Sequence, residues 1–184
     1  MAATPTDVIG FWTAAGPTKW FAKSEAFDAA IRLKFEPVHY AAARGEYAHW
    51  TDNPQGALAL LILLDQFPRN LFRGNAHAFA TDPLARSIAS RAIAAGLDKQ
   101  VAPQLRQFFY LPFEHSEANE DQDRSVALGE AHDADTGEIG TLKWAVIHRD
   151  IIRRFGRFPH RNAALGRVTT LEEQAFLDEG GFSG

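Results

Sequence analysis

The stretch "DNPQGALALLILLDQF", residues 52–67, decides how the rest of this chain has to fold. Asn53 can cap a helix whose first position is Pro54, and the residues that follow are apolar on every side of that helix. A helix that is apolar all round is stable only when other elements enclose it. The sequence therefore predicts a central buried helix surrounded by the remainder of the chain.

Helix signals are dense along the whole chain, and strand signals are nearly absent. Polar caps precede amphipathic stretches, and the predicted capping positions are Asp7, Ser24, Asn53, Asp82 and the capping box of Thr170 and Glu173. With 184 residues, 46% of them hydrophobic, the chain has the material for one sizeable core. We predict an all-α fold, an antiparallel array of seven to eight helices in a single domain over residues 1–184, with a frayed tail at 179–184.

Two prolines are predicted to disturb their helices. Pro37 lies inside the helix that begins after Ser24 and is stopped by Gly45, and Pro112 lies inside the helix that begins at Pro103. An interior proline removes one backbone hydrogen bond and crowds the carbonyl four residues earlier. We therefore expect both helices to bend or to divide.

Composition excludes several chemistries and compartments. The chain has no cysteine, so thiol catalysis and thiolate metal sites are ruled out, and it shows neither a spaced histidine pair of the HExxH type nor a glycine-rich phosphate loop. We expect neither a cofactor nor a metal. The longest apolar run, residues 57–64, is too short to span a bilayer, and residues 1–12 do not resemble a signal peptide. These features predict a cytoplasmic protein with no membrane partner.

An acidic block precedes a basic block in the second half of the chain. Residues 114–138 hold nine acidic residues and one arginine, whereas residues 143–167 hold six arginines and one lysine with one acidic residue. Neighbouring blocks of opposite sign can neutralise each other within a fold, which argues against a basic surface that faces nucleic acid. We therefore expect no nucleic-acid partner.

Two Phe-Pro corners share a pattern, "QFPRN" at residues 66–70 and "RFPHRN" at residues 157–162, and each follows a helix predicted to be buried. Proline ends a helix, and the phenylalanine before it can fold back onto the core. Asp65 falls in the predicted last turn of the first helix, where a carboxylate is unfavourable unless it is paired. Arg69, Arg73 or an arginine of the second corner is the expected partner.

If the two corners meet, their polar side chains can form a pocket for an anionic small molecule or the acidic end of a peptide. The alternative is that the same pairs are purely structural and that function lies in a partner interface elsewhere. The candidate ligand-binding residues are Asp65, Arg69, Arg73, Arg157, Arg161, Asn162 and Arg167.

Three residues are candidates for acid–base catalysis: His148, His115 and Glu117. His148 lies on the apolar stripe of its predicted helix, so it is either a hydrogen-bonded core residue or a proton-transfer group in a half-buried cleft. His115 and Glu117 belong to "EHSE", residues 114–117, whose carboxylates either face the arginines or take part in chemistry. The second hypothesis is therefore a hydrolase or transferase that acts on an anionic substrate with a histidine acid or base.

Long stretches of this sequence resemble a bacterial family known as domain of unknown function 924. They are "KWFAKSEAFDAAI", "LILLDQFPRNLFRG", "FFYLPFEHSE" and "HRDIIRRFGRFPHRNAALGRVTTLEEQAFL". The resemblance extends from about Val8 to Leu177, and it implies an all-helical fold similar to tetratricopeptide-like arrays with no established activity. A concave helical surface for a peptide is an expectation by analogy of fold only. The matching signature positions are Trp20, Phe21, Asp28, Asp65, Gln66, Arg69, Asn70, Arg73, His115, Glu117, His148, Phe155, Gly156, Arg157, Arg161, Asn162 and Arg167.

Overall fold

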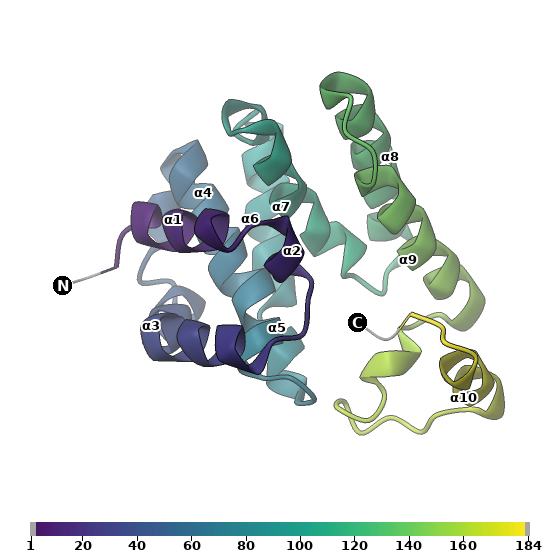
Figure 1. The fold of residues 1–184 in the computed structure, drawn as a ribbon. Coiled ribbons are helices and arrows are strands. Elements are labelled where there is room, and N and C mark those ends of the chain that lie inside the picture. The colour runs from purple at the N-terminus through teal and green to yellow at the C-terminus, as the bar shows by residue number, and fades with distance from the viewer. Residues whose placement is uncertain (1–2, 183–184) are drawn as a thin grey trace. The chain divides into compact units, whose positions relative to one another are not determined.

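The computed structural model describes residues 3–182, and these residues form helices and connections without strands (Figure 1). Eight of the helices within this range have seven or more residues, which confirms the predicted all-α class and helix number. The chain divides into two compact units: unit 1 comprises Met1–Arg73 and His77–Pro112, and unit 2 comprises Gly74–Ala76 and Phe113–Gly184. The single-domain organisation stays a prediction. Of the predicted frayed tail, residues 183–184 lie outside the described residues.

Unit 1 is built mainly from the first six helices and most of the seventh. Their bounds are α1 Pro5–Ala15, α2 Pro17–Trp20, α3 Glu25–Ala43, α4 Pro54–Leu61, α5 Phe67–Leu71, α6 Asp82–Ala94 and α7 Pro103–Glu114. A π-helix, η2, joins α4 to α5 over Ile62–Gln66, and the 3-10 segments are η1 Ala48–Asp52, η3 Ala76–Phe79 and η4 Asp98–Gln100. Unit 2 contains α8 Asn119–Thr136, α9 Thr141–Phe155, η5 Pro159–Arg161 and α10 Leu171–Asp178.

The predicted central buried helix is present in unit 1. Every residue from Gly56 to Gln66 is buried, and the combined rod of α4 and η2 is contacted by α1, α3 and α6. Figure 1 shows α1 running across α4. Three neighbouring helices thus pack around this apolar segment, because each Å² of apolar surface removed from water stabilises the fold by about 25 cal/mol.

Aromatic side chains fill the space between these helices. The rings of Trp12 and Phe108 meet edge to face, with their centres 5.6 Å apart. Trp20 donates its indole N–H to the carbonyl of Trp12 at 2.7 Å. Phe21 is 63% exposed, whereas six other aromatic residues of this unit are buried: Trp12, Trp20, Trp50, Phe108, Phe109 and Tyr110. Their role in unit 1 is therefore core packing.

Three predicted caps are confirmed. The hydroxyl of Ser24 accepts from the N–H of Phe27, and the side chain of Asn53 accepts from Gly56. Thr170 and Glu173 form the predicted reciprocal capping box at the start of α10. Such caps satisfy backbone N–H groups that a helix cannot pair internally.

Two predicted caps are wrong by a few positions. Asp7 occupies the third position of α1, where it completes a capping box with Thr4, and Thr4 is the actual cap. Asp82 is the first residue of α6, and Thr81 precedes it as the cap. In both cases the acidic residue lies in the first turn, where the helix dipole favours negative charge.

Neither interior proline divides its helix. α3 continues through Pro37, and α7 continues through Pro112. The carbonyl that loses its donor at Pro37 belongs to Leu33, which is 84% exposed, so water can replace the missing bond. The boundary between the two units falls directly after Pro112.

The central helix does not end before the first Phe-Pro corner, contrary to the prediction. The chain widens into η2, where Phe67 donates its N–H to the carbonyl of Ile62, and it then continues as α5. Pro68 accounts for this widening, because it has no N–H to donate and its ring crowds the carbonyl four residues earlier. Asp65 consequently lies inside a continuing helical path rather than in a last turn.

Two buried side chains replace the donor that Pro68 lacks. His39 Nδ1 donates to the carbonyl of Leu63 at 2.8 Å, and Thr81 Oγ1 donates to the carbonyl of Leu64 at 2.5 Å. Burial lowers the pKa of His39, which keeps the ring neutral with its proton on Nδ1. The π-helix is therefore stabilised by side chains from α3 and from the start of α6.

We expect Thr81→Val to lower the free energy of unfolding by about 1–3 kcal/mol, because it leaves the buried carbonyl of Leu64 without its donor. Urea denaturation followed by circular dichroism measures this loss. Thr51→Val is the matched control, since the Thr51 hydroxyl donates to the carbonyl of Ala48 in an exposed position. Equal losses for the two variants would contradict the role given to Thr81.

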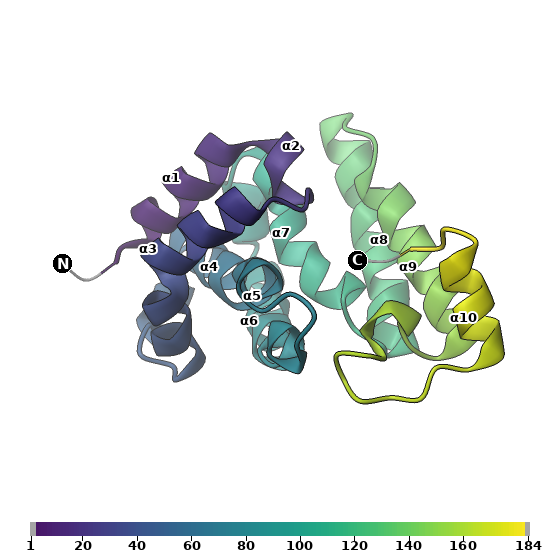
Figure 2. The same cartoon turned by 60° about the horizontal axis from the view of Figure 1, so that its bottom comes forward.

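In unit 2, α8 and α9 lie side by side along their length (Figure 1). The connection between them is only four residues long, over positions 137–140, so the two helices run antiparallel. Gly129 permits their close approach, because a Cβ atom there would come within 2.9 Å of the Cα atom of Leu142. The second view shows α10 beside α9 in the same unit (Figure 2).

We expect Gly129→Ala to destabilise the protein by about 1–3 kcal/mol, because the added methyl group meets backbone that has to shift. Gly10→Ala, also inside a helix, is the control: its Cβ meets nothing within 4 Å, so alanine should instead stabilise α1 by about 0.5–1 kcal/mol. Thermal unfolding of the two variants against the parent measures both effects, and opposite signs are expected.

Candidate functional site

Unit 2 gathers most of the sequence-predicted site residues around Phe158, a fully buried ring. His148 and His160 each lie with ring centres 5.6 Å from the ring centre of Phe158, and the guanidinium carbon of Arg161 lies 4.4 Å from it. His115 lies 6.3 Å from His148, ring to ring. We call this cluster the Phe158 corner: His115, His148, Phe158, His160 and Arg161, with the carboxylates of Glu114 and Glu117.

Local sequence explains why the corner forms where it does. α9 ends at Gly156, whose φ of 70° is the left-handed conformation that glycine adopts at helix ends. The chain then turns through Phe158 into η5, a 3-10 turn that begins at Pro159 and carries Arg161. The second Phe-Pro corner thus follows a helix end, as predicted, while the first does not.

A carboxylate and a backbone carbonyl hold His148. Its Nδ1 lies 3.1 Å from the carboxylate of Glu114 and 2.9 Å from the carbonyl of Trp144. Glu114 and His148 are 4% and 5% exposed. Since both neighbours accept hydrogen bonds, the proton is on Nδ1 and the basic nitrogen of the neutral ring is Nε2.

Glu117 is shared by several donors. Arg167 donates to its two carboxylate oxygens at 2.8 Å each, and the N–H of Phe158 donates at 3.0 Å. Burial raises the pKa of Glu117, but the bonds from Arg167 and Phe158 and the charge of Arg161 outweigh it, so the pKa lies below its usual value. One carboxylate therefore lies in the field of two guanidinium groups.

A second ion pair ties the end of α9 to α10. Arg157 donates to both oxygens of Glu173 at 2.6 and 2.9 Å, and Asn162 and the N–H of Thr170 also donate to this carboxylate. The hydrogen bonds from Arg157 lower the pKa of Glu173 to about 2. Arg157, Asn162 and Arg167 therefore have structural partners within unit 2.

The other predicted ligand-binding residues lie in unit 1, where they also have partners. Asp65 is fully buried and pairs with Arg69, and Arg69 in turn bonds both oxygens of Asp82 at 3.1 Å. Arg69 is the partner of Asp65 that the sequence suggests first.

Arg73 pairs instead with Asp28, donating at 2.5 and 3.0 Å, while Asn70 donates to the same carboxylate at 2.8 Å. The predicted polar residues thus pair with partners inside their own unit. A meeting of the two Phe-Pro corners stays a prediction.

Sequence reasoning missed three of the acidic partners. The sequence indicates only a capping role for Asp82, only a family position for Asp28 and only half of a capping box for Glu173, whereas each of them pairs with an arginine. A local signal existed for Asp82 alone, since it follows the first corner closely. Asp28 and Glu173 lie 45 and 16 positions from their arginines, and no short-range pattern connects them.

The described part of the chain also bears on metals and membranes. Among residues 3–182, no group of three or more His, Asp or Glu side chains is arranged to hold a metal ion. No helix in the same range has both the length and the apolar character needed to cross a bilayer.

Fold and site together define an all-helical protein with partly buried guanidinium–carboxylate pairs in each of its two compact units. The chain belongs to the family described as bacterial protein of unknown function, DUF924, whose profile matches residues 8–181. It is similar to a solved structure of a protein of unknown function from Agrobacterium tumefaciens, with 49% identity over 96% of this chain and 97% of that one and a TM-score of 0.90. No curated protein matches this chain. The family resemblance inferred from the sequence is therefore confirmed.

Proposed function

We propose that the Phe158 corner binds a small molecule that carries a phosphate or carboxylate group. The observation that carries this proposal is the shared carboxylate of Glu117, which lies under the charge of both Arg161 and Arg167. Arg157 already forms a bidentate pair with Glu173. The guanidinium groups of Arg161 and Arg167 therefore act together on one carboxylate, and an anion is the ligand that a positive field of this kind attracts.

Arg161 is the residue on which the proposal depends most. It is only 6% exposed, and its guanidinium lies over the ring of Phe158. Stacking on an aromatic face holds the planar fork in a fixed orientation, and a fixed fork recognises phosphate or carboxylate oxygens in pairs. The ring of His160, whose nitrogens can also donate hydrogen bonds, lies beside the same Phe158 ring.

Titration with inorganic phosphate, followed by two-dimensional NMR, tests the proposal. We expect a saturable response of the amides at positions 158 and 160–162. Arg161→Gln should weaken phosphate binding about tenfold or more, which corresponds to a loss of about 1.4 kcal/mol of binding free energy. Arg161→Lys keeps the charge without the fork and should show an intermediate loss. A phosphate response that all variants share would contradict the proposal.

The control for net charge is Arg153→Gln. Arg153 lies on α9 in the same unit, and its 53% exposed side chain pairs with Asp123, which is also exposed. We expect its phosphate affinity to stay within about twofold of the parent, since exposed pairs contribute little. Circular dichroism of each variant shows whether unit 2 remains folded, and the titration is interpreted for folded variants.

A specific observation also favours a second candidate function, an enzyme with His148 as acid or base. The pairing of His148 Nδ1 with Glu114 and the carbonyl of Trp144 resembles the arrangement in which a carboxylate orients a catalytic imidazole. The reaction would be a hydrolysis or group transfer on an anionic substrate, with guanidinium groups stabilising developing negative charge.

A panel of phosphate and carboxylate esters tests this candidate. Turnover by the parent protein that falls at least 100-fold in His148→Gln supports it, because general acid–base groups contribute about 10²–10⁴ to a rate. His49→Gln, an exposed histidine of unit 1, is the control. Equal turnover of parent and His148→Gln, or none by either, would remove His148 catalysis on those esters.

The same proposal includes a cytoplasmic location and a concave, tetratricopeptide-like arrangement of helices as the setting of the site. The first is supported by the lack of a bilayer-spanning helix among residues 3–182, and the second by the all-helical fold. Cell fractionation tests the location, and solution scattering tests the arrangement.

A further inference from the structure

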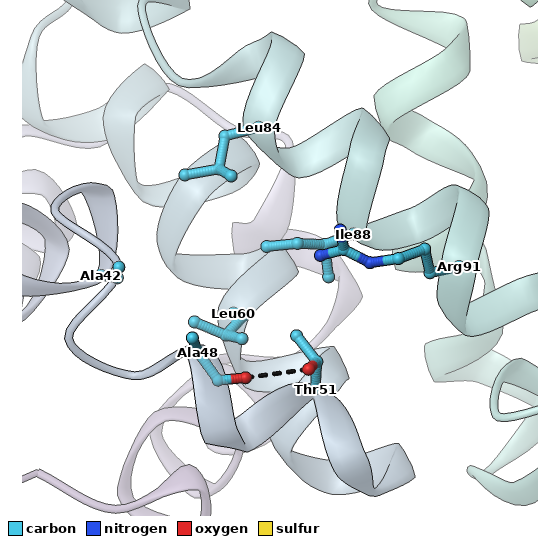
Figure 3. Close-up of a pocket in the computed structure, with 8 residues that line it drawn as sticks. Ala42, Ala48, Thr51, Leu60, Leu84, Ile88 and Arg91 are labelled. Atoms are coloured by element: carbon cyan, nitrogen blue, oxygen red, sulfur yellow. Dashed lines mark hydrogen bonds between the residues drawn. The ribbon is translucent and has the colours of Figure 1, made fainter.

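Unit 1 contains a small apolar cavity, of about 110 Å³, far in sequence from the Phe158 corner. Its lining comes from the end of α3, from η1, from α4 and from α6, and Figure 3 shows most of these side chains. The lining residues are Ala42, Gly45, Ala48, Thr51, Leu60, Leu84, Ile88 and Arg91. None of them belongs to the site described above.

Small residues and larger apolar residues line the cavity together. The small residues that line it are Ala42 at the end of α3, Gly45 in the connection that follows and Ala48 in η1, and a Cβ added at Gly45 meets nothing within 4 Å. Two larger apolar residues of the lining, Leu60 and Ile88, are 2% and 5% exposed. The floor of the cavity is therefore apolar and buried, while Gly45 and Ala48 lie at its open side, where both are exposed.

One cation lies at the rim. Arg91 lines the cavity from the last turn of α6, and in Figure 3 its side chain reaches toward Ile88. Among residues 3–182 its guanidinium has neither a hydrogen bond nor an ion pair, although most arginines of unit 1 pair with a carboxylate or a carbonyl. An apolar floor beside an unpaired guanidinium is complementary to a molecule that is apolar at one end and anionic at the other.

We infer that this cavity is a binding site for a short-chain aliphatic monocarboxylate. The chain packs on Leu60 and Ile88, and the carboxylate accepts hydrogen bonds from Arg91 at the rim. A volume of about 110 Å³ is the room of roughly four groups the size of a water molecule, at about 30 Å³ each, so the four-carbon chain of pentanoate fits. The Thr51 hydroxyl donates to the carbonyl of Ala48 at 2.8 Å, which leaves the floor without a competing donor for the aliphatic chain.

Titration of the full-length protein with pentanoate, followed by two-dimensional NMR, tests the inference. We expect saturable shifts of the amides of Gly45, Ala48, Leu84 and Ile88, and at least tenfold weaker responses to pentanol and pentylamine, which match the chain but lack the anion. Acetate, which has the charge without the chain, should be similarly weak. The reporting amides all belong to unit 1, so this outcome is independent of phosphate binding at the Phe158 corner.

Two variants separate the charge from the cavity. Arg91→Gln should weaken pentanoate binding at least tenfold while leaving the weak response to pentanol unchanged. Ala48→Leu fills the open side from an exposed position, so it should abolish both responses without unfolding the protein. Lys99→Gln removes one exposed positive charge of unit 1 outside the cavity, and its affinity should equal that of the parent.

Several results would overturn the inference. They are shifts that fail to saturate, equal responses to pentanoate and pentanol in the parent protein, and unchanged pentanoate affinity in Arg91→Gln. Shifts confined to amides of unit 2 would likewise overturn it, because they would assign carboxylate binding to the other cluster.

Discussion

Replacing Arg69 with glutamine is expected to lower the free energy of unfolding by about 3–5 kcal/mol, the largest effect of any single substitution considered for this chain. Arg69 lies between two carboxylates: Asp65, whose side chain is 1% exposed, and Asp82, whose side chain is 8% exposed. Burial works against the charged guanidinium, but the charges of Asp65 and Asp82 outweigh it and raise the pKa of Arg69. Glutamine would leave two buried negative charges without their cation.

Denaturation in guanidinium chloride at pH 7 measures the effect of Arg69→Gln. The control is Arg44→Gln, because Arg44 and Glu46 form an ion pair of the same chemistry in unit 1 with side chains 61% and 52% exposed. An exposed pair of this kind contributes about 0–1 kcal/mol. If the two variants lost similar stability, burial would not be what makes the Asp65–Arg69–Asp82 cluster strong.

Glu173→Gln is expected to have the second largest effect, a loss of about 2 kcal/mol or more at neutral pH. The Glu173 carboxylate accepts four hydrogen bonds, two of them from Arg157, and its side chain is 3% exposed. A glutamine amide can accept on one side only, and its N–H groups face the donors of Asn162 and Thr170. The start of α10 would lose its link to the turn that follows α9.

The effect of Glu173→Gln should depend on pH in a defined window. The pKa of Glu173 is about 2 in the folded protein against an ordinary value of 4.5, so the unfolded chain takes up this proton first as the pH falls. The stabilisation by Glu173 is full above pH 4.5 and is lost as the pH falls from 4.5 to about 2. The difference between parent and variant should shrink over the same range.

Hydrogen exchange of the amides of α10, together with circular dichroism, measures this difference at several pH values. Glu172→Gln is the neighbouring control, since Glu172 pairs with Arg154 on an open surface where the side chains are 64% and 53% exposed. We expect it to change stability by less than about 1 kcal/mol at every pH. A constant difference between parent and Glu173→Gln from pH 7 to pH 2 would contradict the proposed role of this carboxylate.

Features set by a few neighbouring residues were predictable. The caps at Ser24 and Asn53, the capping box of Thr170 and Glu173, and the buried central helix all depend on interactions within about one helical turn or on a continuous apolar run. The local rule for proline, that a helix bends or divides, led to no division at Pro37, because the rule takes no account of where the freed carbonyl points. There, an exposed position lets water restore the bond that proline removes.

The π-helix was not predictable from its own residues. Its freed carbonyls are satisfied by His39 of α3 and by Thr81, which lie 24 and 17 positions away from their acceptors. A rule based on neighbouring residues considers only that Pro68 cannot donate a backbone hydrogen bond, and it therefore predicts that the helix ends there. The helix continues because tertiary neighbours supply the missing donors.

The sequence by itself determined the all-helical class, the number of long helices, the buried centre of unit 1 and the family. These properties follow from apolar periodicity, capping residues and long motifs, and each of these signals is found in residues that are adjacent in the sequence. Only the tertiary structure decided which acid each arginine pairs with, that the predicted histidines and Arg161 surround Phe158, and that an apolar cavity lies beside Arg91. The physical reason is distance along the chain: Glu117 and Arg167 are 50 positions apart, and packing of whole helices, not local pattern, brings such groups within hydrogen-bonding range.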